Sequence, residues 1–521
     1  MSCFFRTTPS LPRATPRLYQ QLFVCRRCLN TQSQSRAATS PRVFHSKRQT
    51  PFLHVFRTQT THAPTLSSNG AARDAASPLG ALSRSIGASV TPRTRAFPET
   101  SDRAVAYWLL GSAASVFGIV VFGGLTRLTE SGLSITEWRP VTGSRPPMSA
   151  QDWTYEFDRY RASPEFKLLN PRMTLDEFKQ IYWMEWTHRL WGRVVGLTFL
   201  LPTAYFIARR RVSAGMALKL TGICALIGFQ GVLGWWMVKS GLKDDLFKPG
   251  SHPRVSQYRL TAHLGTAFVC YLAMLWNGLQ ILRENRLLNP NTLSASSAQL
   301  KTLAHPSLKP FRRAVVALTA LVFVTALSGG LVAGLDAGLI YNEFPYMGLG
   351  LTPPKKELWD PWYSHTAAPH PDLWWRNMLE NPSLVQLDHR VLATTTFCAV
   401  HALWAYARWN PTAKRLLSAS ARSGVKLVLA LVWVQVTLGV STLLYLVPTP
   451  LAAAHQAGAL ALLSGMLVLG SRVWVPKRAM RLLRLRMSTA GSKGVGVGVG
   501  GARGPGAVLA AGHGGAERVV A

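Results

Sequence analysis

Four histidines stand near the starts of alternate long apolar segments, at positions that match between the two halves of the chain: His188, His263, His389 and His455. If these segments cross a membrane as helices, all four run in the same direction. The imidazoles then lie at similar depth, within about the first two turns. Histidine is uncommon inside membrane spans and is usually functional there. The pattern therefore indicates two pairs of imidazoles on one side of a membrane.

Two neutral imidazoles on neighbouring helices are the usual axial ligands of a low-spin haem, and a four-helix bundle provides the slot. Zinc or copper would need three or four ligands converging on one ion. No Cys, Asp or further His stands near enough in the sequence to supply them. Any single histidine could instead be a polar anchor between helices, but four at matching positions favour haem.

The two halves differ three positions before the first histidine of each pair. The first half has Glu185 before His188, whereas the second has the neutral Gln386 before His389. Residues three apart share a helix face, so Glu185 points the same way as its histidine. A carboxylate beside a haem can accept a proton, stabilise a developing cation or orient a water, none of which an electron-transfer haem needs. We therefore expect chemistry in the first half, and electron transfer or structural support in the second.

A structural role for Glu185 is the alternative, because the carboxylate could simply pair with Arg189 or Arg193. Asp388 also tempers the asymmetry between the halves, although its place next to His389 turns it to a different helix face. Both interpretations of Glu185 stay open at the level of the sequence.

Arginines lie in or beside the same segments, at Arg189, Arg193 and Arg390. An uncompensated arginine inside a span costs roughly 2.5 to 3.5 kcal/mol, so these side chains need anions. Haem propionates would accept charge-assisted hydrogen bonds from them, and we assign Arg189 and Arg390 to cofactor binding on this ground. Snorkelling toward the lipid headgroups is the alternative, and Arg127 is a weaker candidate for the same role.

The elements that must position these residues are eight apolar segments, each about 20 residues long, which is the length that crosses a bilayer core as a helix. They fall at 104–125, 186–208, 216–238, 260–282, 312–333, 386–408, 424–446 and 451–475. Gly123-Gly124-Leu125 recurs as Gly329-Gly330-Leu331, and Gln230-x-x-Leu233-Gly234 recurs as Gln435-x-x-Leu438-Gly439. We predict an all-α polytopic membrane protein with eight transmembrane helices as two pseudo-repeated four-helix bundles.

Charge sets the expected orientation. The loops after the second, fourth and sixth segments hold 15 Lys or Arg and one acid, whereas the loops after the first, third and fifth are nearly balanced. The positive-inside rule then places the even-numbered loops and both termini in the matrix of a mitochondrion, with the histidines toward the intermembrane space. The two long outer loops, 126–185 and 334–385, are rich in aromatic residues and are expected to carry function or to act as plain lids.

The tails carry more than half of the net charge of +35. Residues 1–73 contain 11 Lys or Arg and no acid, which is typical of a mitochondrial transit peptide. No nucleic-acid-binding motif accompanies this charge, so we expect no nucleic-acid partner. The predicted organisation is a leader (1–98), a first bundle (99–285), a matrix linker (286–311), a second bundle (312–476) and a basic, Gly-rich disordered tail (477–521).

In these motifs the chain resembles the haem A synthases, above all their mitochondrial members. The matching segments run in order across all eight predicted spans, from about 104 to 475: Gly123 to Ser134, Tyr182 to Gly192 with Glu185-x-x-His188-Arg189, Gln230 to Leu242, Tyr258 to His263, Asp388-His389-Arg390 and Leu443 to Gly458.

The resemblance implies conversion of haem O to haem A for cytochrome c oxidase, in which the C8 methyl of the porphyrin becomes a formyl group through an alcohol. By that resemblance His188 and His263 hold the substrate haem, Glu185 is the catalytic carboxylate, and His389 and His455 ligate a resident haem b. Implied partners are membrane lipid, a ferredoxin-type electron donor, haem O synthase, oxidase assembly factors and a second copy of the chain. Some bacterial members carry a cysteine pair in the first outer loop, which is absent here.

Three other classes of protein remain as alternatives. A transmembrane di-haem electron carrier of the b type would explain four histidines without catalysis, but not Glu185 in one half alone. A transporter could use the histidines as a proton relay. A haem O-forming prenyltransferase would need paired Asp-rich motifs, which this sequence lacks.

Overall fold

The computed structural model describes residues 96–247 and 253–495, so the predicted transit peptide and the Gly-rich end of the chain lie outside the described residues. Within those ranges the elements are helices and turns, with no strand. The long helices are α3 (Arg103–Leu128), α6 (Leu175–Ala208), α7 (Ala214–Gly241), α8 (Gln257–Leu287), α10 (Lys309–Gly334), α13 (Pro382–Trp409), α15 (Ala419–Leu444) and α16 (Thr449–Val473). The chain is therefore an all-α protein, as predicted.

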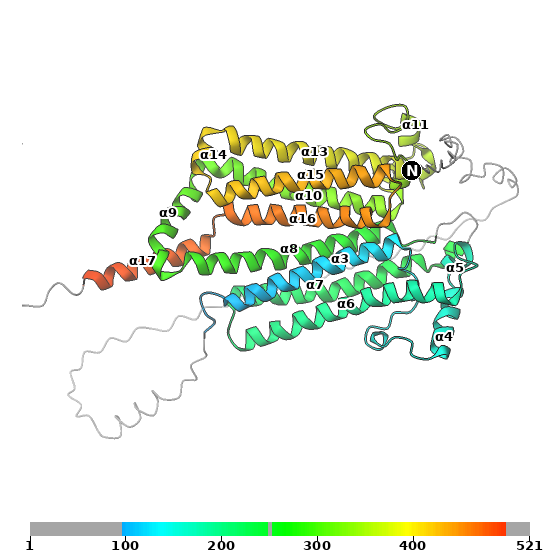
Figure 1. Ribbon diagram of the computed structural model, residues 1–521, viewed down its shortest axis with the longest axis horizontal. Coiled ribbons are helices and arrows are strands. Elements are labelled where there is room, and N and C mark those ends of the chain that lie inside the picture. Colours follow the sequence, from blue (N-terminus) through cyan, green and yellow to red (C-terminus); the bar gives the residue numbers. More distant parts are fainter. Residues whose placement is uncertain (1–95, 248–252, 496–521) are drawn as a thin grey trace, which may run out of the picture. The chain divides into compact units, whose positions relative to one another are not determined.

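The long helices form two groups of four (Figure 1). In the first group α3 packs against α6 and α8, and α7 packs against the same two helices. In the second group α10 and α15 both pack against α13 and α16. Helices α3 and α8 of the first group meet α10 and α16 of the second, and one apolar core continues across this boundary.

Shorter helices gather at the two ends of these groups (Figure 1). At one end, here called the loop end, lie the segments 129–174 and 335–381 with α4 (Ala150–Arg161), α5 (Pro164–Leu168), α11 (Lys355–Leu358) and α12 (Leu373–Glu380). At the other, here called the tail end, lie α9 (Leu293–Ala304), α14 (Pro411–Leu416) and α17 (Lys477–Val495). The two long predicted outer loops thus lie at the same end of the protein.

Helix α6 begins at Leu175, well before the predicted apolar segment 186–208, because the residues around Thr174 cap its first turn. The Thr174 hydroxyl accepts a hydrogen bond from the backbone N–H of Glu177, and the Glu177 carboxylate accepts one from the backbone N–H of Thr174. This reciprocal pair satisfies two backbone donors that a helix start otherwise leaves unpaired. As a result, His188 lies in the middle of a 34-residue helix rather than at its end.

Seven of the described helices are long and apolar enough to cross a membrane, one fewer than the eight predicted. The exception is α13, which occupies the sixth predicted segment and packs between α10 and α15. Its sequence carries Gln386, Asp388, His389, Arg390 and His401, and these polar residues lower its hydropathy. The protein is a polytopic membrane protein, and the count of eight spans stays a prediction.

The prediction of a disordered tail from residue 477 is wrong for its first part. Residues Lys477–Val495 form α17, whose Ala479, Leu482 and Leu483 are buried in a small apolar cluster with α9. Composition alone predicts disorder here. It does not show that α9 offers an apolar surface on which one face of a basic helix packs.

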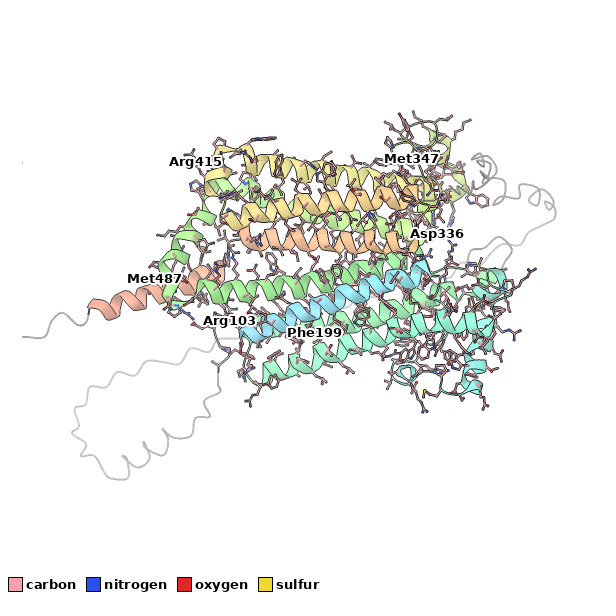
Figure 2. All side chains as sticks on the ribbon, in the orientation of Figure 1. Arg103, Phe199, Asp336, Met347, Arg415 and Met487 are labelled. Carbon is pink, nitrogen blue, oxygen red and sulfur yellow. The ribbon has the colours of Figure 1, made fainter. Side chains whose placement is uncertain are left out.

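A charged contact joins the two groups at the loop end. The guanidinium of Arg127, at the end of α3, donates to the carboxylate of Asp336 across 2.9 Å, and Arg254 pairs with the same carboxylate. Asp336 follows α10 in the left-handed backbone region, with φ of 50°. It lies between the two groups of helices (Figure 2). Two cations therefore depend on one carboxylate that bridges the halves.

We predict that Asp336→Asn lowers the thermal stability of the purified protein. Asparagine keeps the size and tolerates the left-handed backbone, but leaves Arg127, whose side chain is only 15% exposed, without its anion. We expect a loss of about 1–3 kcal/mol, the cost of a buried donor left unsatisfied, measured as a lower unfolding midpoint. Asp158→Asn is the matched control, because its pair with Arg161 is more than half exposed on both sides and contributes little. Equal midpoints for the two variants would refute a bridging role.

Candidate functional site

Each of the four predicted ligand histidines faces a glycine on a neighbouring helix. A Cβ added to Gly123 of α3 would lie 2.7 Å from Cε1 of His188 on α6, and one added to Gly439 of α15 would lie 2.7 Å from Cε1 of His455 on α16. The corresponding distances for the other two pairs, Gly234 with His263 and Gly329 with His389, are 3.5 and 3.1 Å. No side chain larger than hydrogen fits at Gly123 or Gly439 unless the imidazole moves.

The second pair has a spacing that suits a metal between the rings. The ring centroids of His389 and His455 lie 6.4 Å apart, and the rings are perpendicular. An imidazole nitrogen bonds a transition metal at about 2 Å, so two such bonds plus half a ring on each side come to roughly 6 Å. The residues present therefore fit a haem held by two histidines. In the parts of the chain that the structure describes, no group of three or more His, Cys, Asp or Glu could hold a metal ion.

Glutamines hold the backbone at one histidine of each half. Nε2 of Gln230 donates to the carbonyl of His263 across 3.2 Å, and Nε2 of Gln435 donates to the carbonyl of His455 across 3.0 Å. Each glutamine stands four residues before the glycine that faces the same histidine, so both lie on one helix face. The sequence showed these residues only as a repeated motif, and their contact with the histidines is evident only in the structure.

The imidazole nitrogens differ in their partners. Nδ1 of His389 lies 2.7 Å from the hydroxyl of Ser328, whereas Nδ1 of His188, His263 and His455 is buried and has no hydrogen-bond partner among the described residues. A hydrogen bond to the second ring nitrogen orients a metal-bound imidazole. If His389 ligates a haem, Ser328 would orient its ring, and sequence reasoning did not find this contact.

Glu185 is buried and accepts four hydrogen bonds. Its Oε2 accepts from the Ser134 hydroxyl at 2.7 Å and from the backbone N–H of Ile135 at 2.8 Å. Its Oε1 accepts from Nε and Nη2 of Arg189 at 3.0 and 2.6 Å. The ion pair with Arg189 that the structural interpretation requires is thus present, and the carboxylate holds the segment after α3 against α6.

Arg189 completes this connection by donating to the carbonyls of Ile135 and Glu137 at 2.8 and 2.9 Å. Arg193, one turn further along α6, donates to the carbonyls of Arg139 and Pro140, each at 2.9 Å. Each of the two arginines therefore donates to two backbone carbonyls of the first outer segment. The predicted contact of Arg189 with a haem propionate stays a prediction.

The second half uses the same construction with a neutral amide. Gln386 Nε2 and Arg390 Nη2 both donate to the carbonyl of Tyr341, at 3.0 and 2.9 Å, and Arg390 Nη1 donates to the carbonyl of Tyr346 at 3.1 Å. No hydrogen bond joins Gln386 to Arg390, and among the described residues the buried Nε of Arg390 has no partner. A propionate contact of Arg390 likewise stays a prediction.

A second carboxyl group of the first outer segment is buried near Glu185. Glu165 of α5 is 3% exposed. Its Oε1 accepts a hydrogen bond of 3.4 Å from the Tyr160 hydroxyl, and its Oε2 has no partner among the described residues. Burial, together with the carboxylates of Glu185 and Glu130, raises the pKa of Glu165 to about 8, and Arg127 opposes this shift. Glu165 is therefore mostly a neutral acid at pH 7.

The chain matches known proteins over most of its length. A family model described as "Cytochrome oxidase assembly protein" (COX15-CtaA) matches residues 106–467. "Heme A synthase COX15" of Saccharomyces cerevisiae is 51% identical over 382 residues, which cover 73% of this chain and 77% of that protein. "Heme A synthase COX15" of Homo sapiens is 47% identical over 373 residues, or 71% of this chain and 82% of that protein.

The name of a third relative describes a fusion with a ferredoxin. The "Heme A synthase-mitochondrial ferredoxin fusion protein" of Schizosaccharomyces pombe is 49% identical over 387 residues. The match covers 74% of this chain and 62% of that protein.

We predict that Gly123→Ala displaces His188 and lowers the haem content of the purified protein. The added methyl group would overlap the imidazole, and a close-packed interior offers it no other room. Gly111→Ala on the same helix is the matched control, because nothing lies within 4 Å of that position. Haem bound per chain, measured from the absorption spectrum, should fall toward half in Gly123→Ala and stay unchanged in the control. Unchanged haem in both variants would show that the close contact between Gly123 and His188 does not position a haem ligand.

The raised pKa of Glu165 predicts how the stability of the protein changes with pH. Its pKa lies above its ordinary value of 4.5, so between 4.5 and about 8 the folded protein holds a proton that the unfolded chain has lost. Stability therefore falls as pH rises through this interval. In Glu165→Gln this part of the pH dependence should disappear from thermal unfolding curves, while Glu343→Gln, which removes an exposed carboxylate, should keep it. The idea fails if Glu165→Gln and the wild type have the same slope.

Proposed function

The chain belongs to the COX15-CtaA family of cytochrome oxidase assembly proteins, and we propose that it is an oxidoreductase that converts haem O to haem A for cytochrome c oxidase. The relatives above are named for haem A synthesis, and they match the chain across both groups of helices. The observation that carries the residue-level proposal is the set of four histidine–glycine contacts, together with Glu185 three residues before His188 where the second half has Gln386 before His389.

His188 and His263 hold the substrate haem O in the first half, and His389 and His455 hold a resident haem b in the second. When bound, haem b supplies one-electron transfer. The perpendicular rings of His389 and His455, and the Ser328 hydroxyl on Nδ1 of His389, support this assignment. The neutral Gln386 suits a haem that only passes electrons, because it offers no group that titrates.

Glu185 is the catalytic carboxylate in this proposal. The C8 methyl of haem O becomes an alcohol and then a formyl group, and in this proposal the Glu185 carboxylate holds or passes, at Oε1 or Oε2, a proton that moves during these steps. Ser134, Ile135 and Arg189 stabilise the anionic form by four hydrogen bonds. The same contacts hold the outer segment over the site, so Glu185 acts both on the reaction and as an anchor for the lid.

The name of the Schizosaccharomyces pombe relative supports a ferredoxin-type electron donor, since fusion keeps two successive partners at high effective concentration. We further propose that the protein lies in the mitochondrial inner membrane, with both termini in the matrix and the loop end toward the intermembrane space. Haem O synthase, oxidase assembly factors and a second copy of the chain are expected partners.

The test is to purify Glu185→Gln beside the wild type, extract the haems and separate haem B, O and A by chromatography and mass. We expect the variant to keep haem B and to accumulate haem O or its alcohol. Haem A should fall by about 10²-fold or more, the usual contribution of acid–base catalysis.

Ser134→Ala is the matched control, because it removes one hydrogen bond of the anchor and leaves the carboxylate in place. It should keep most haem A. Wild-type haem A in Glu185→Gln would mean that Glu185 is structural. Haem B in both pairs of histidines, with neither haem O nor haem A in any preparation, would favour a di-haem electron carrier.

A further inference from the structure

Helix α17 starts at the membrane boundary. The last candidate span, Thr449–Ser488, comprises the apolar α16, which ends at Val473, and the beginning of the arginine-rich α17, which starts at Lys477. Between them, Trp474 packs edge to face with Trp276 of α8 at 6.2 Å between ring centroids. Tryptophan is enriched where membrane helices meet the headgroups. The first turns of α17 therefore lie at the depth of the lipid headgroups.

The inner face of α17 is occupied by the protein. Ala479, Leu482 and Leu483 are buried in the cluster with α9, as described above. Two arginines on this side are also engaged: Arg478 donates to the Ser213 hydroxyl at 3.0 Å, and Arg486 donates to the carbonyl of Leu288 at 2.9 Å. These contacts fix the rotation of α17 about its own axis.

The outer face carries three further cations. Lys477, Arg481 and Arg484 are exposed and spaced four and three residues apart, so they follow one stripe of the helix. Within residues 96–247 and 253–495 they have no hydrogen bond or ion pair, and α17 itself contains no acid. Together with Met480 and Leu485 they line an open pocket of about 450 Å³.

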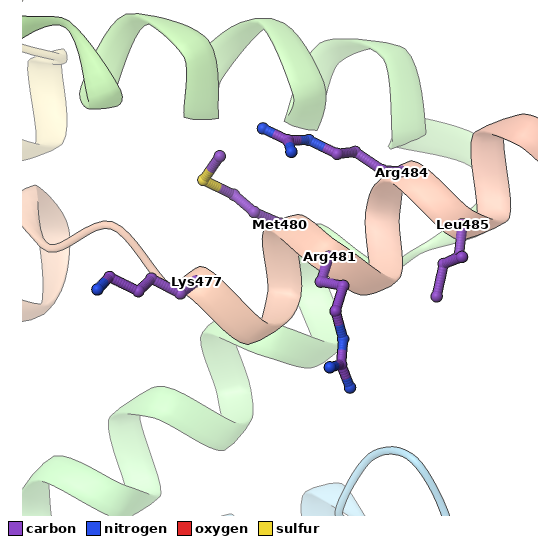
Figure 3. A pocket seen from close by; sticks show the side chains of 5 residues that line it. All are labelled: Lys477, Met480, Arg481, Arg484 and Leu485. Atoms are coloured by element: carbon purple, nitrogen blue, oxygen red, sulfur yellow. The ribbon is translucent and has the colours of Figure 1, made fainter.

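The arrangement combines positive charge with apolar surface. Figure 3 shows Arg484 and Met480 extending to one side of the helix axis, Arg481 and Leu485 to the other, and Lys477 at its start. Leu485 and Met487 are 54% and 39% exposed beside these cations. Basic side chains clustered directly after a membrane span are typical of segments that bind anionic lipid headgroups. A soluble anion such as inorganic phosphate would use the cations but leave the apolar residues in water.

We propose that this outer face of α17 is a binding site for the headgroup of an anionic phospholipid, whose phosphate contacts Lys477, Arg481 and Arg484. The site depends on α17 lying at a membrane, and it is independent of the haem chemistry proposed above.

The experiment measures lipid binding to the full-length protein in nanodiscs. The wild type and Lys477→Gln/Arg481→Gln/Arg484→Gln are placed in phosphatidylcholine with increasing fractions of phosphatidylglycerol or cardiolipin. Retained anionic lipid is then counted by native mass spectrometry. Each cation near an anionic headgroup contributes roughly fivefold in affinity, so the triple variant should bind anionic lipid about 100-fold more weakly. Haem content should remain that of the wild type.

Two further variants separate a site from general surface charge. Lys477→Arg/Arg481→Lys/Arg484→Lys keeps the charge and should keep the lipid. Arg408→Gln/Lys414→Gln/Arg415→Gln removes three exposed cations from α13 and α14 near the same end and should also keep it. The proposal is overturned if this control loses as much lipid as the α17 variant, or if inorganic phosphate added to pure phosphatidylcholine discs reproduces the effect of the anionic lipid.

Discussion

The structure depends most on the close approach of helix backbones to the imidazoles of the site. Each of the four histidines lies against a glycine of a neighbouring helix, and at two of these places a single methyl group would already overlap the ring. A histidine inside a membrane has no water to satisfy its nitrogens, so it must be held where a ligand or a hydrogen bond can meet it. Glycine provides this room because two helices can approach without a side chain between them.

Buried charges at the loop end follow from the same constraint. Arg189, Arg193 and Arg390 donate to backbone carbonyls of the outer segments, and only Arg189 also has a carboxylate partner in Glu185. Arginine can do this because its planar group presents several donors at fixed angles. Each side chain thereby satisfies loop carbonyls that would otherwise lack donors. The lids over the two sites are held by the helices that carry His188 and His389.

The two halves share this construction and differ in its charge. In the first half the Glu185 carboxylate pairs with Arg189 where the outer segment meets α6. Glu165, a neutral acid of that segment, lies nearby. In the second half an amide takes the place of the carboxylate and binds a loop carbonyl. A buried carboxylate and a neutral amide thus occupy matching places on similar frames. This difference supports the proposed division between oxidation of a substrate and transfer of electrons.

The sequence by itself determined the all-α membrane class and the family, because insertion into a bilayer depends on the length of apolar segments, which is a local property. It placed His188 near the start of a span, whereas the structure places it in the middle of α6. It did not reveal that Glu185 and Arg189 pair with Ser134 and Ile135, that Ser328 meets His389, or that α17 packs on α9. These contacts join residues that stand far apart in the chain. Only the packing of the helices decides which donors and acceptors come within hydrogen-bond distance, since periodicity shows which face a residue occupies but not what lies opposite to it.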